Sequence, residues 1–146
     1  MNRTLHNFSE IFIHIVWHCH DNRPLINEDI EPELYQFIEK YCRNTKGVYF
    51  KGLGGTPTHI HLAFQVEPHI SFSDFIGKLK GASSHEMNNL FGKGAIQWQR
   101  GYGIVSFAKK NLSAIIKYIA NQKEHHKKMT LNEVLETIAA EFKEKR

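Results

Sequence analysis

Residues 59–62 alternate between polar and apolar side chains, a pattern that predicts an extended strand. Successive side chains of a strand point to opposite faces of the sheet, so His59 and His61 share one face. The other face carries the apolar residues Ile60, Leu62 and Phe64. The chain must therefore build a sheet with one buried face and one face on which two imidazoles converge. Because imidazole is a common metal ligand, that second face is a candidate for half of a metal site.

Hydrophobic periodicity predicts the elements around this strand. Their order is strand, helix, two strands, helix, one or two strands, and two helices, which matches a split β-α-β pattern. We therefore expect an α+β, ferredoxin-like fold: an antiparallel sheet whose first and third strands are central neighbours, with helices packed on the apolar face. The third helix is then the candidate to cover the histidine face. The expected elements are strands at 11–18, 48–53, 58–66, 96–99 and 102–107, and helices at 31–44, about 71–90, about 111–128 and about 131–143.

The length of 146 residues suits one domain, with a core of about 11–128 and a C-terminal helix of about 131–143. The two cysteines, Cys19 and Cys42, show no disulfide or zinc spacing, which indicates reduced thiols in a cytosolic protein. The start of the chain lacks an apolar signal core, and the longest apolar run, 11–17, is too short to span a bilayer. We expect a cytoplasmic protein without a membrane partner.

The formal net charge of +4 is distributed unevenly. Residues 1–50 carry five basic and seven acidic side chains, whereas residues 51–146 carry fourteen basic and eight acidic ones. The basic part also holds His59 and His61, which favours a polyanionic partner such as nucleic acid. Charge alone is equally consistent with solvated lysines on helix surfaces.

Tyr118 and Gln122 are four residues apart in the third predicted helix, so they stand on one helix face about one turn from each other. A phenol can attack phosphorus as a nucleophile, and a carboxamide oxygen can complete a metal site begun by two imidazoles. On this helix alone, a tyrosine at the edge of the core and an exposed glutamine explain the same two residues.

The two fragments together resemble a known family. A His-hydrophobe-His strand followed about sixty residues later by Tyr-x-x-x-Gln is similar to the single-tyrosine HUH transposases of small insertion sequences and their REP-associated relatives. The resemblance covers about 11–128. It also rests on three further stretches: 79–88, the Trp-Gln-Arg-Gly-Tyr-Gly run at 98–103, and the Tyr118 helix with the double histidine at 125–126.

The resemblance implies a DNA transposase that cleaves and rejoins single-stranded DNA. Tyr118 would form a 5′-phosphotyrosine intermediate, and His59, His61 and Gln122 would hold one divalent cation. Family members point to Mg²⁺ or Mn²⁺, whereas two histidines alone also suit zinc or nickel. The partners implied are hairpin DNA at the ends of the mobile element and a second copy of the chain in a homodimer.

Several residues have weaker or no assignments. The Thr56-Pro57-Thr58 run replaces the proline and acidic residue or asparagine of many relatives, which leaves the support of the histidines open. His14 and His18 are given no role. The candidate DNA contacts are basic residues, with an aromatic side chain to stack on unpaired bases: Lys78, Lys80, Lys93, Arg100, Lys109, Lys110 and Lys117, and Tyr102 or Trp98.

The sequence is also consistent with two other functions. A non-catalytic nucleic-acid-binding module can use the same sheet, although the second and third strands lack the clustered aromatic residues of such modules. A metal-dependent phosphoesterase that uses water would need the metal site but not Tyr118. A transposase forms a covalent adduct with DNA, a phosphoesterase releases cleaved DNA without an adduct, and a binding module gives neither product.

Overall fold

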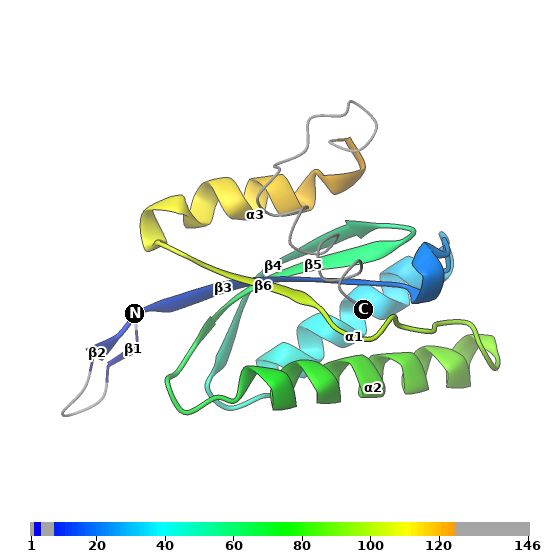
Figure 1. Cartoon of the computed structure of the whole chain (residues 1–146), viewed down its shortest axis with the longest axis horizontal. Coiled ribbons are helices and arrows are strands. Elements are labelled where there is room, and N and C mark those ends of the chain that lie inside the picture. Colours follow the sequence, from blue (N-terminus) through cyan, green and yellow to red (C-terminus); the bar gives the residue numbers. More distant parts are fainter. Residues whose placement is uncertain (1, 4–7, 125–146) are drawn as a thin grey trace.

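A four-stranded antiparallel sheet lies between two helical layers in the computed structural model, which describes residues 2–3 and 8–124 (Figure 1). Its order is β4-β5-β3-β6, so the first long strand and the histidine strand are the central neighbours. This confirms the predicted α+β fold. A separate short pair, β1 and β2, precedes the sheet and was not predicted. The strands are β1 (Asn2–Arg3), β2 (Phe8–Ser9), β3 (Ile11–His18), β4 (Val48–Thr56), β5 (His59–Val66) and β6 (Gly103–Phe107).

The apolar face of the sheet packs on helices α1 (Ile30–Arg43) and α2 (Phe72–Phe91). Acidic residues in the first turn of α1 and basic residues in its last turn complement the helix dipole. Ser71 caps α2 by accepting a hydrogen bond from the backbone of Asp74. The shared core contains alternate residues of β3 and β5 and the helix residues that face them: Ile13, Ile15, Trp17, Ile60, Leu62, Phe64, Leu34, Ile38, Phe75, Ile76 and Leu79.

Helix α3 (Leu112–Ala120) lies on the opposite face, against β4 and β5 (Figure 1). The antiparallel register aligns His18 with His59 and Val16 with His61, so the histidines of β3 and β5 share this face. A 3₁₀ turn, η2 (Lys109–Asn111), leads from β6 into α3. The sheet therefore separates an apolar layer under α1 and α2 from a histidine-rich layer under α3.

The segment at 96–99 is not the strand that its sequence pattern predicts. It pairs with the end of β3 only through one bridge, between Cys19 and Trp98. Side chains of α2 hold it instead: Asn88 exchanges hydrogen bonds with the backbone of Ile96, and the Ser83 hydroxyl accepts one from the Trp98 indole. These side-chain contacts satisfy polar groups that a continuous ladder would otherwise pair.

Helix α3 ends at Ala120, within the helix predicted at about 111–128, whose last four residues lie outside the described residues. Asn121 leaves helical geometry, with φ −104° and ψ 26°, and residues 122–124 form a further helical turn. The predicted C-terminal helix at 131–143 and the histidines at 125 and 126 lie outside the described residues. A 3₁₀ turn, η1 (His20–Asn22), follows β3, and its residues Asp21 and Asn22 adopt positive φ.

Both cysteines are buried and free of disulfides. Burial raises the pKa of the Cys19 thiol to about 11 and that of the Cys42 thiol to about 12, so both stay protonated near neutral pH. Within the described residues, no helix combines the length and the apolar character needed to cross a membrane.

Gly81 lies in the middle of α2, and a Cβ added there would meet no atom within 4 Å. We expect Gly81→Ala to stabilise the fold by about 0.5–1 kcal/mol, because alanine loses less backbone entropy in a helix. Urea unfolding measures the change. Gly92→Ala is the matched control: Gly92 ends α2 at φ 107°, so a side chain there should destabilise the fold. A lower unfolding midpoint for Gly81→Ala would contradict the prediction.

Candidate active site

The two histidines of β5 are buried in the layer between the sheet and α3. His59 is 3% exposed and His61 is fully buried, and their ring centroids are 5.1 Å apart. Both stand on a central strand that is paired on each side, so their backbone positions are held rigidly. The prediction that the two imidazoles share one face is confirmed by the register of β5 with β3 and β4.

Two threonines flank the tight turn between β4 and β5 and bind the first histidine. The Oγ1 atoms of Thr56 and Thr58 lie 3.0 Å and 2.9 Å from His59 Nδ1. The Thr56-Pro57-Thr58 run therefore supplies hydrogen-bonding support to His59. With Nδ1 engaged in this way, Nε2 is the ring nitrogen of His59 that can serve as a metal ligand.

Two histidines of β3 stack on those of β5. His18 stacks on His59, with ring centroids 4.6 Å apart, and its Nδ1 lies 2.7 Å from Asn22 Oδ1. His14 stacks on His61 with centroids 5.0 Å apart, and its Nε2 lies 2.9 Å from His61 Nδ1. The candidate site thus contains four imidazoles in two cross-strand pairs.

Helix α3 brings Tyr118 to the same layer. The Tyr118 ring meets His61 edge to face, with centroids 6.2 Å apart and an interplanar angle of 82°. Gln122 follows the irregular residue Asn121, is 1% exposed, and places its Nε2 3.5 Å from the carbonyl oxygen of Tyr118. The structure therefore brings the predicted nucleophile to the histidines within one chain, and it buries the glutamine that the sequence pattern alone left as an exposed residue.

Two features hold α3 in place. A Cβ at Gly54 of β4 would collide with the backbone carbonyl of Ile119, so the glycine permits the close approach of the helix to the sheet. Beyond the helix, the Lys123 ammonium donates to both carboxylate oxygens of Glu31, at 2.8 Å and 2.6 Å. This ion pair ties the turn that carries Gln122 to the start of α1.

The donor set fits a divalent cation. Two imidazole nitrogens and an amide oxygen are ligands of intermediate hardness, suited to Mn²⁺, Zn²⁺ or Ni²⁺ and compatible with Mg²⁺. Within the described chain, no group of three or more His, Cys, Asp and Glu side chains is arranged to hold a metal. A cation bound by His59 and His61 would therefore need a ligand of another kind, and Gln122 is the residue of that kind predicted here.

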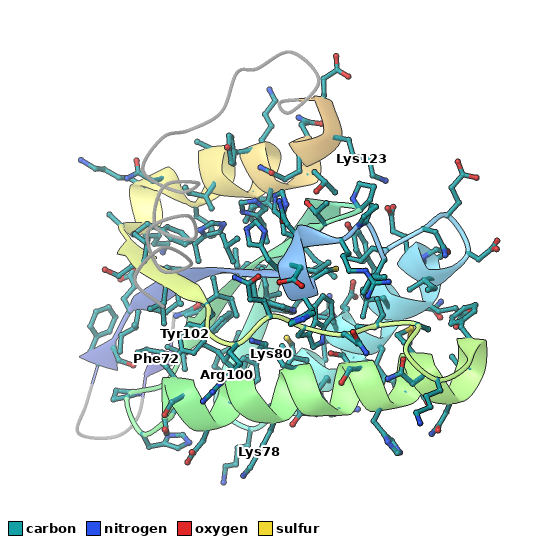
Figure 2. All side chains as sticks on the ribbon, turned by 45° about the vertical axis from the view of Figure 1, so that its right-hand side comes forward. Phe72, Lys78, Lys80, Arg100, Tyr102 and Lys123 are labelled. Atoms are coloured by element: carbon teal, nitrogen blue, oxygen red, sulfur yellow. The ribbon has the colours of Figure 1, made fainter. Side chains whose placement is uncertain are left out.

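The candidate DNA-contact residues lie on different sides of the molecule. Lys78, Lys80 and Arg100 lie on α2 and the segment after it (Figure 2), whereas Lys117 lies on α3 across the sheet. Lys80 donates to the carbonyls of Gln99 and Gly101, at 2.7 Å and 2.8 Å, and so holds the segment that presents Arg100. The other candidates are exposed or half-buried: Lys93, Lys109, Lys110, Lys117, Trp98 and Tyr102.

The segment around Arg100 is close to the histidine pairs in the fold. The backbone of Gln99 donates to the carbonyl of His18, so this segment runs beside the end of β3. Arg100 is exposed, and Tyr102 is half-buried next to it. Their roles in DNA contact stay predictions, as do those of the lysines.

The sequence-based assignment missed His14, His18 and the two threonines. A signal for the histidines exists, because His14 and His18 alternate on the second face of the 11–18 strand, the face that meets His59 and His61 once β3 and β5 pair. The threonine contacts depend on the two-residue turn between Thr56 and His59, which the sequence pattern did not specify.

Comparison with known proteins supports the assignment of the family. Over 75 residues the chain is 37% identical to the transposases for insertion sequence element IS200 of Salmonella typhimurium and Salmonella typhi. The match covers 47% of this chain and 49% of each relative, so the chain spans about half the length of the curated relatives it matches.

Two solved structures share the fold. A candidate transposase from Deinococcus radiodurans R1 superimposes with a TM-score of 0.68 at 21% identity, covering 84% of this chain and 98% of that one. A REP-associated tyrosine transposase bound to a REP hairpin gives a TM-score of 0.56 at 15% identity, covering 82% of this chain and 70% of that one.

A family model described as "Transposase IS200 like" matches residues 7–122, which include every strand of the central sheet, α3 and the four residues predicted to form the site. The match thus extends over most of the chain and over both halves of the candidate site. The protein belongs to the IS200-like transposase family.

Proposed function

We propose that this protein is a transposase that cleaves and rejoins single-stranded DNA through a phosphotyrosine intermediate. The observation that carries the proposal is the packing of the Tyr118 ring against His61 within one chain. A nucleophile, two imidazoles and a buried amide therefore converge in one layer between α3 and the sheet. This combination supports the transposase over a phosphoesterase that uses water, because the latter has no need of a tyrosine there.

His59, His61 and Gln122 are the proposed ligands of a divalent cation. When bound, the cation would polarise the scissile phosphate and offset the charge that develops during displacement. The chain's own contribution is to hold the ligands: Thr56 and Thr58 engage Nδ1 of His59, and the central strand fixes both imidazoles. We propose Mg²⁺ or Mn²⁺ on the basis of the family, with zinc or nickel as the alternatives that the donor set admits.

Tyr118 is the proposed nucleophile. Its Oη attacks the phosphorus, a bond from Oη to phosphorus forms, and the bond from phosphorus to the 3′ oxygen breaks. The products are a 5′-phosphotyrosine and a free 3′-hydroxyl, which takes up one proton in exchange for the proton lost by the phenol. Because the phosphodiester is exchanged rather than hydrolysed, a second 3′-hydroxyl can reverse the step and join two strands without a nucleotide cofactor.

The proposed substrate is a DNA hairpin with an adjoining single strand. One structural neighbour was solved with a REP hairpin, which supports this choice of partner. The excess of basic side chains in residues 51–146 favours a polyanion, and exposed Arg100 lies on the segment beside β3. We also propose a homodimer, as the family resemblance implies, and sedimentation with and without DNA measures it.

A labelled DNA hairpin with a single-stranded flank tests the proposal. The protein is incubated with the DNA and Mn²⁺ or Mg²⁺, and the products are separated under denaturing conditions. We expect a protein–DNA adduct that resists denaturation and that does not form when EDTA is present from the start of the reaction. Free cleaved DNA without an adduct would instead support the phosphoesterase, and binding without cleavage would support a nucleic-acid-binding module.

A further inference from the structure

His14 is a buried polar residue that the proposed chemistry does not yet use. It lies on the central strand β3 and is 1% exposed. Its Nε2 lies 2.9 Å from Nδ1 of His61, and the two rings are stacked at an interplanar angle of 24°. Burying an imidazole is unfavourable unless its polar atoms are hydrogen-bonded, so the pairing with His61 accounts for how His14 is tolerated in the sheet.

The contact with His14 involves Nδ1 of His61, and whether this atom carries a proton decides whether Nε2 can bind a metal. A neutral imidazole carries one proton, and Nε2 can bind a metal only when that proton is on Nδ1. The 2.9 Å contact admits either direction of donation. Donation from Nδ1–H of His61 to Nε2 of His14 leaves Nε2 of His61 ready to bind a cation, whereas donation from Nε2–H of His14 places the proton of neutral His61 on Nε2.

The other histidine of β5 is supported at the same atom by different groups. Nδ1 of His59 is engaged by the hydroxyls of Thr56 and Thr58, which come from its own hairpin. Nδ1 of His61 is reached across the sheet by His14. Ala63 is the residue opposite His14 in the register, and its small side chain leaves room for the His14 ring to lean diagonally toward His61.

We propose that His14 is a positioning residue that preorganises His61 for a divalent cation by accepting the hydrogen bond of its Nδ1–H. The proposal rests on the proposed function in one respect, the use of His61 as a metal ligand. A metal-binding histidine commonly donates its second N–H to a carboxylate or a carbonyl, and in this proposal the imidazole of His14 is the acceptor. His14 itself does not contact the substrate or the cation.

Two measurements without DNA test the proposal. Nitrogen-15 NMR of the metal-free protein reports which nitrogen of His61 carries the proton, and electron paramagnetic resonance reports the Kd for Mn²⁺. We expect Nδ1–H in the wild type. In His14→Phe, which keeps a planar ring but has no acceptor, we expect a shift toward Nε2–H and about 10- to 100-fold weaker Mn²⁺ binding.

Two further variants separate positioning from packing. Phe12→Leu changes a buried residue on the same face of β3 that packs on Phe107 rather than on His61, so it should leave the Mn²⁺ affinity unchanged. His14→Gln offers an amide oxygen as acceptor and should recover part of the affinity lost in His14→Phe. If Phe12→Leu weakens Mn²⁺ binding as much as His14→Phe does, His14 acts through packing and the proposal is wrong.

The wild-type spectrum decides the matter even if His14→Phe does not fold. A proton on Nε2 of His61 in the wild-type protein would overturn the proposal. The measurements also distinguish a failure of this proposal from a failure of the proposed function. Mn²⁺ binding that depends on His14 together with an absence of any DNA adduct would refute the phosphotyrosine chemistry alone. Adduct formation with a His61 spectrum and an affinity that do not depend on His14 would refute this inference alone.

Discussion

Tyr118→Phe should bind hairpin DNA and Mn²⁺ as the wild type does but should form no covalent adduct. Phenylalanine keeps the ring that packs edge to face on His61 and removes only the hydroxyl that attacks phosphorus. Loss of a sole nucleophile typically lowers turnover by at least ~10³-fold, so strand cleavage should fall below detection. A denaturing gel measures the adduct, and fluorescence anisotropy measures DNA binding.

Tyr49→Phe is the matched control for this substitution. Tyr49 lies on β4 and is 39% exposed, so loss of its hydroxyl should leave adduct formation unchanged. An adduct that persists in Tyr118→Phe would show that another residue is the nucleophile. Tyr35 is a poor substitute, because burial of its hydroxyl, with Glu31 nearby, raises its pKa well above the ordinary range for tyrosine.

Gly54→Ala should have the second largest effect, although Gly54 makes no contact with DNA in the proposed mechanism. The added Cβ would collide with the carbonyl of Ile119, and a backbone atom can yield only if α3 moves away from β4. A shift of about 1 Å in a reacting group typically costs about 10²-fold in rate, so we expect a loss of that order. Single-turnover cleavage measures it, and circular dichroism checks that the sheet is intact.

Gly52→Ala tests whether the effect is specific. Gly52 lies two residues earlier on the same strand, and a Cβ there would sit 3.4 Å from the Ile116 side chain, which is an ordinary contact. We expect cleavage close to that of the wild type. Equal rates for Gly54→Ala and Gly52→Ala would show that the seating of α3 on the sheet does not control the position of Tyr118.

The fold could be predicted from the sequence because its long strands have unambiguous patterns. Alternation in β3 and β5 separates an apolar face from a histidine face, and these two strands were predicted to within one residue of their observed limits. The prediction for β4 was too short, because the strand continues through Gly54 and Gly55 to Thr56. The segment at 96–99 misled the prediction, because Ile96 is buried in the core while the Asn88 side chain binds the backbone of Ile96. Such nonlocal contacts leave no periodic signal in one sequence.

The candidate site could be predicted in part. His59, His61 and Tyr118 were found because their chemistry and spacing match a family pattern, and the structure brings them together. His14 was not assigned, because its proposed role depends on a contact with His61, which is 47 residues away in the sequence. The metal, the chemistry of Tyr118 and the DNA contacts stay predictions.

The turn between β4 and β5 has a consequence for the order in which the site forms during folding. Thr56, Thr58 and His59 are within four consecutive residues, and a tight hairpin is among the fastest elements to form. Tyr118 instead lies about sixty residues after His59 in the sequence. Contacts between such distant residues form late, because closing the intervening loop costs entropy. We therefore expect a folding chain to acquire the hydrogen-bonded His59 well before it acquires its nucleophile, so that early folding species have half of a metal site and no capacity to attack DNA.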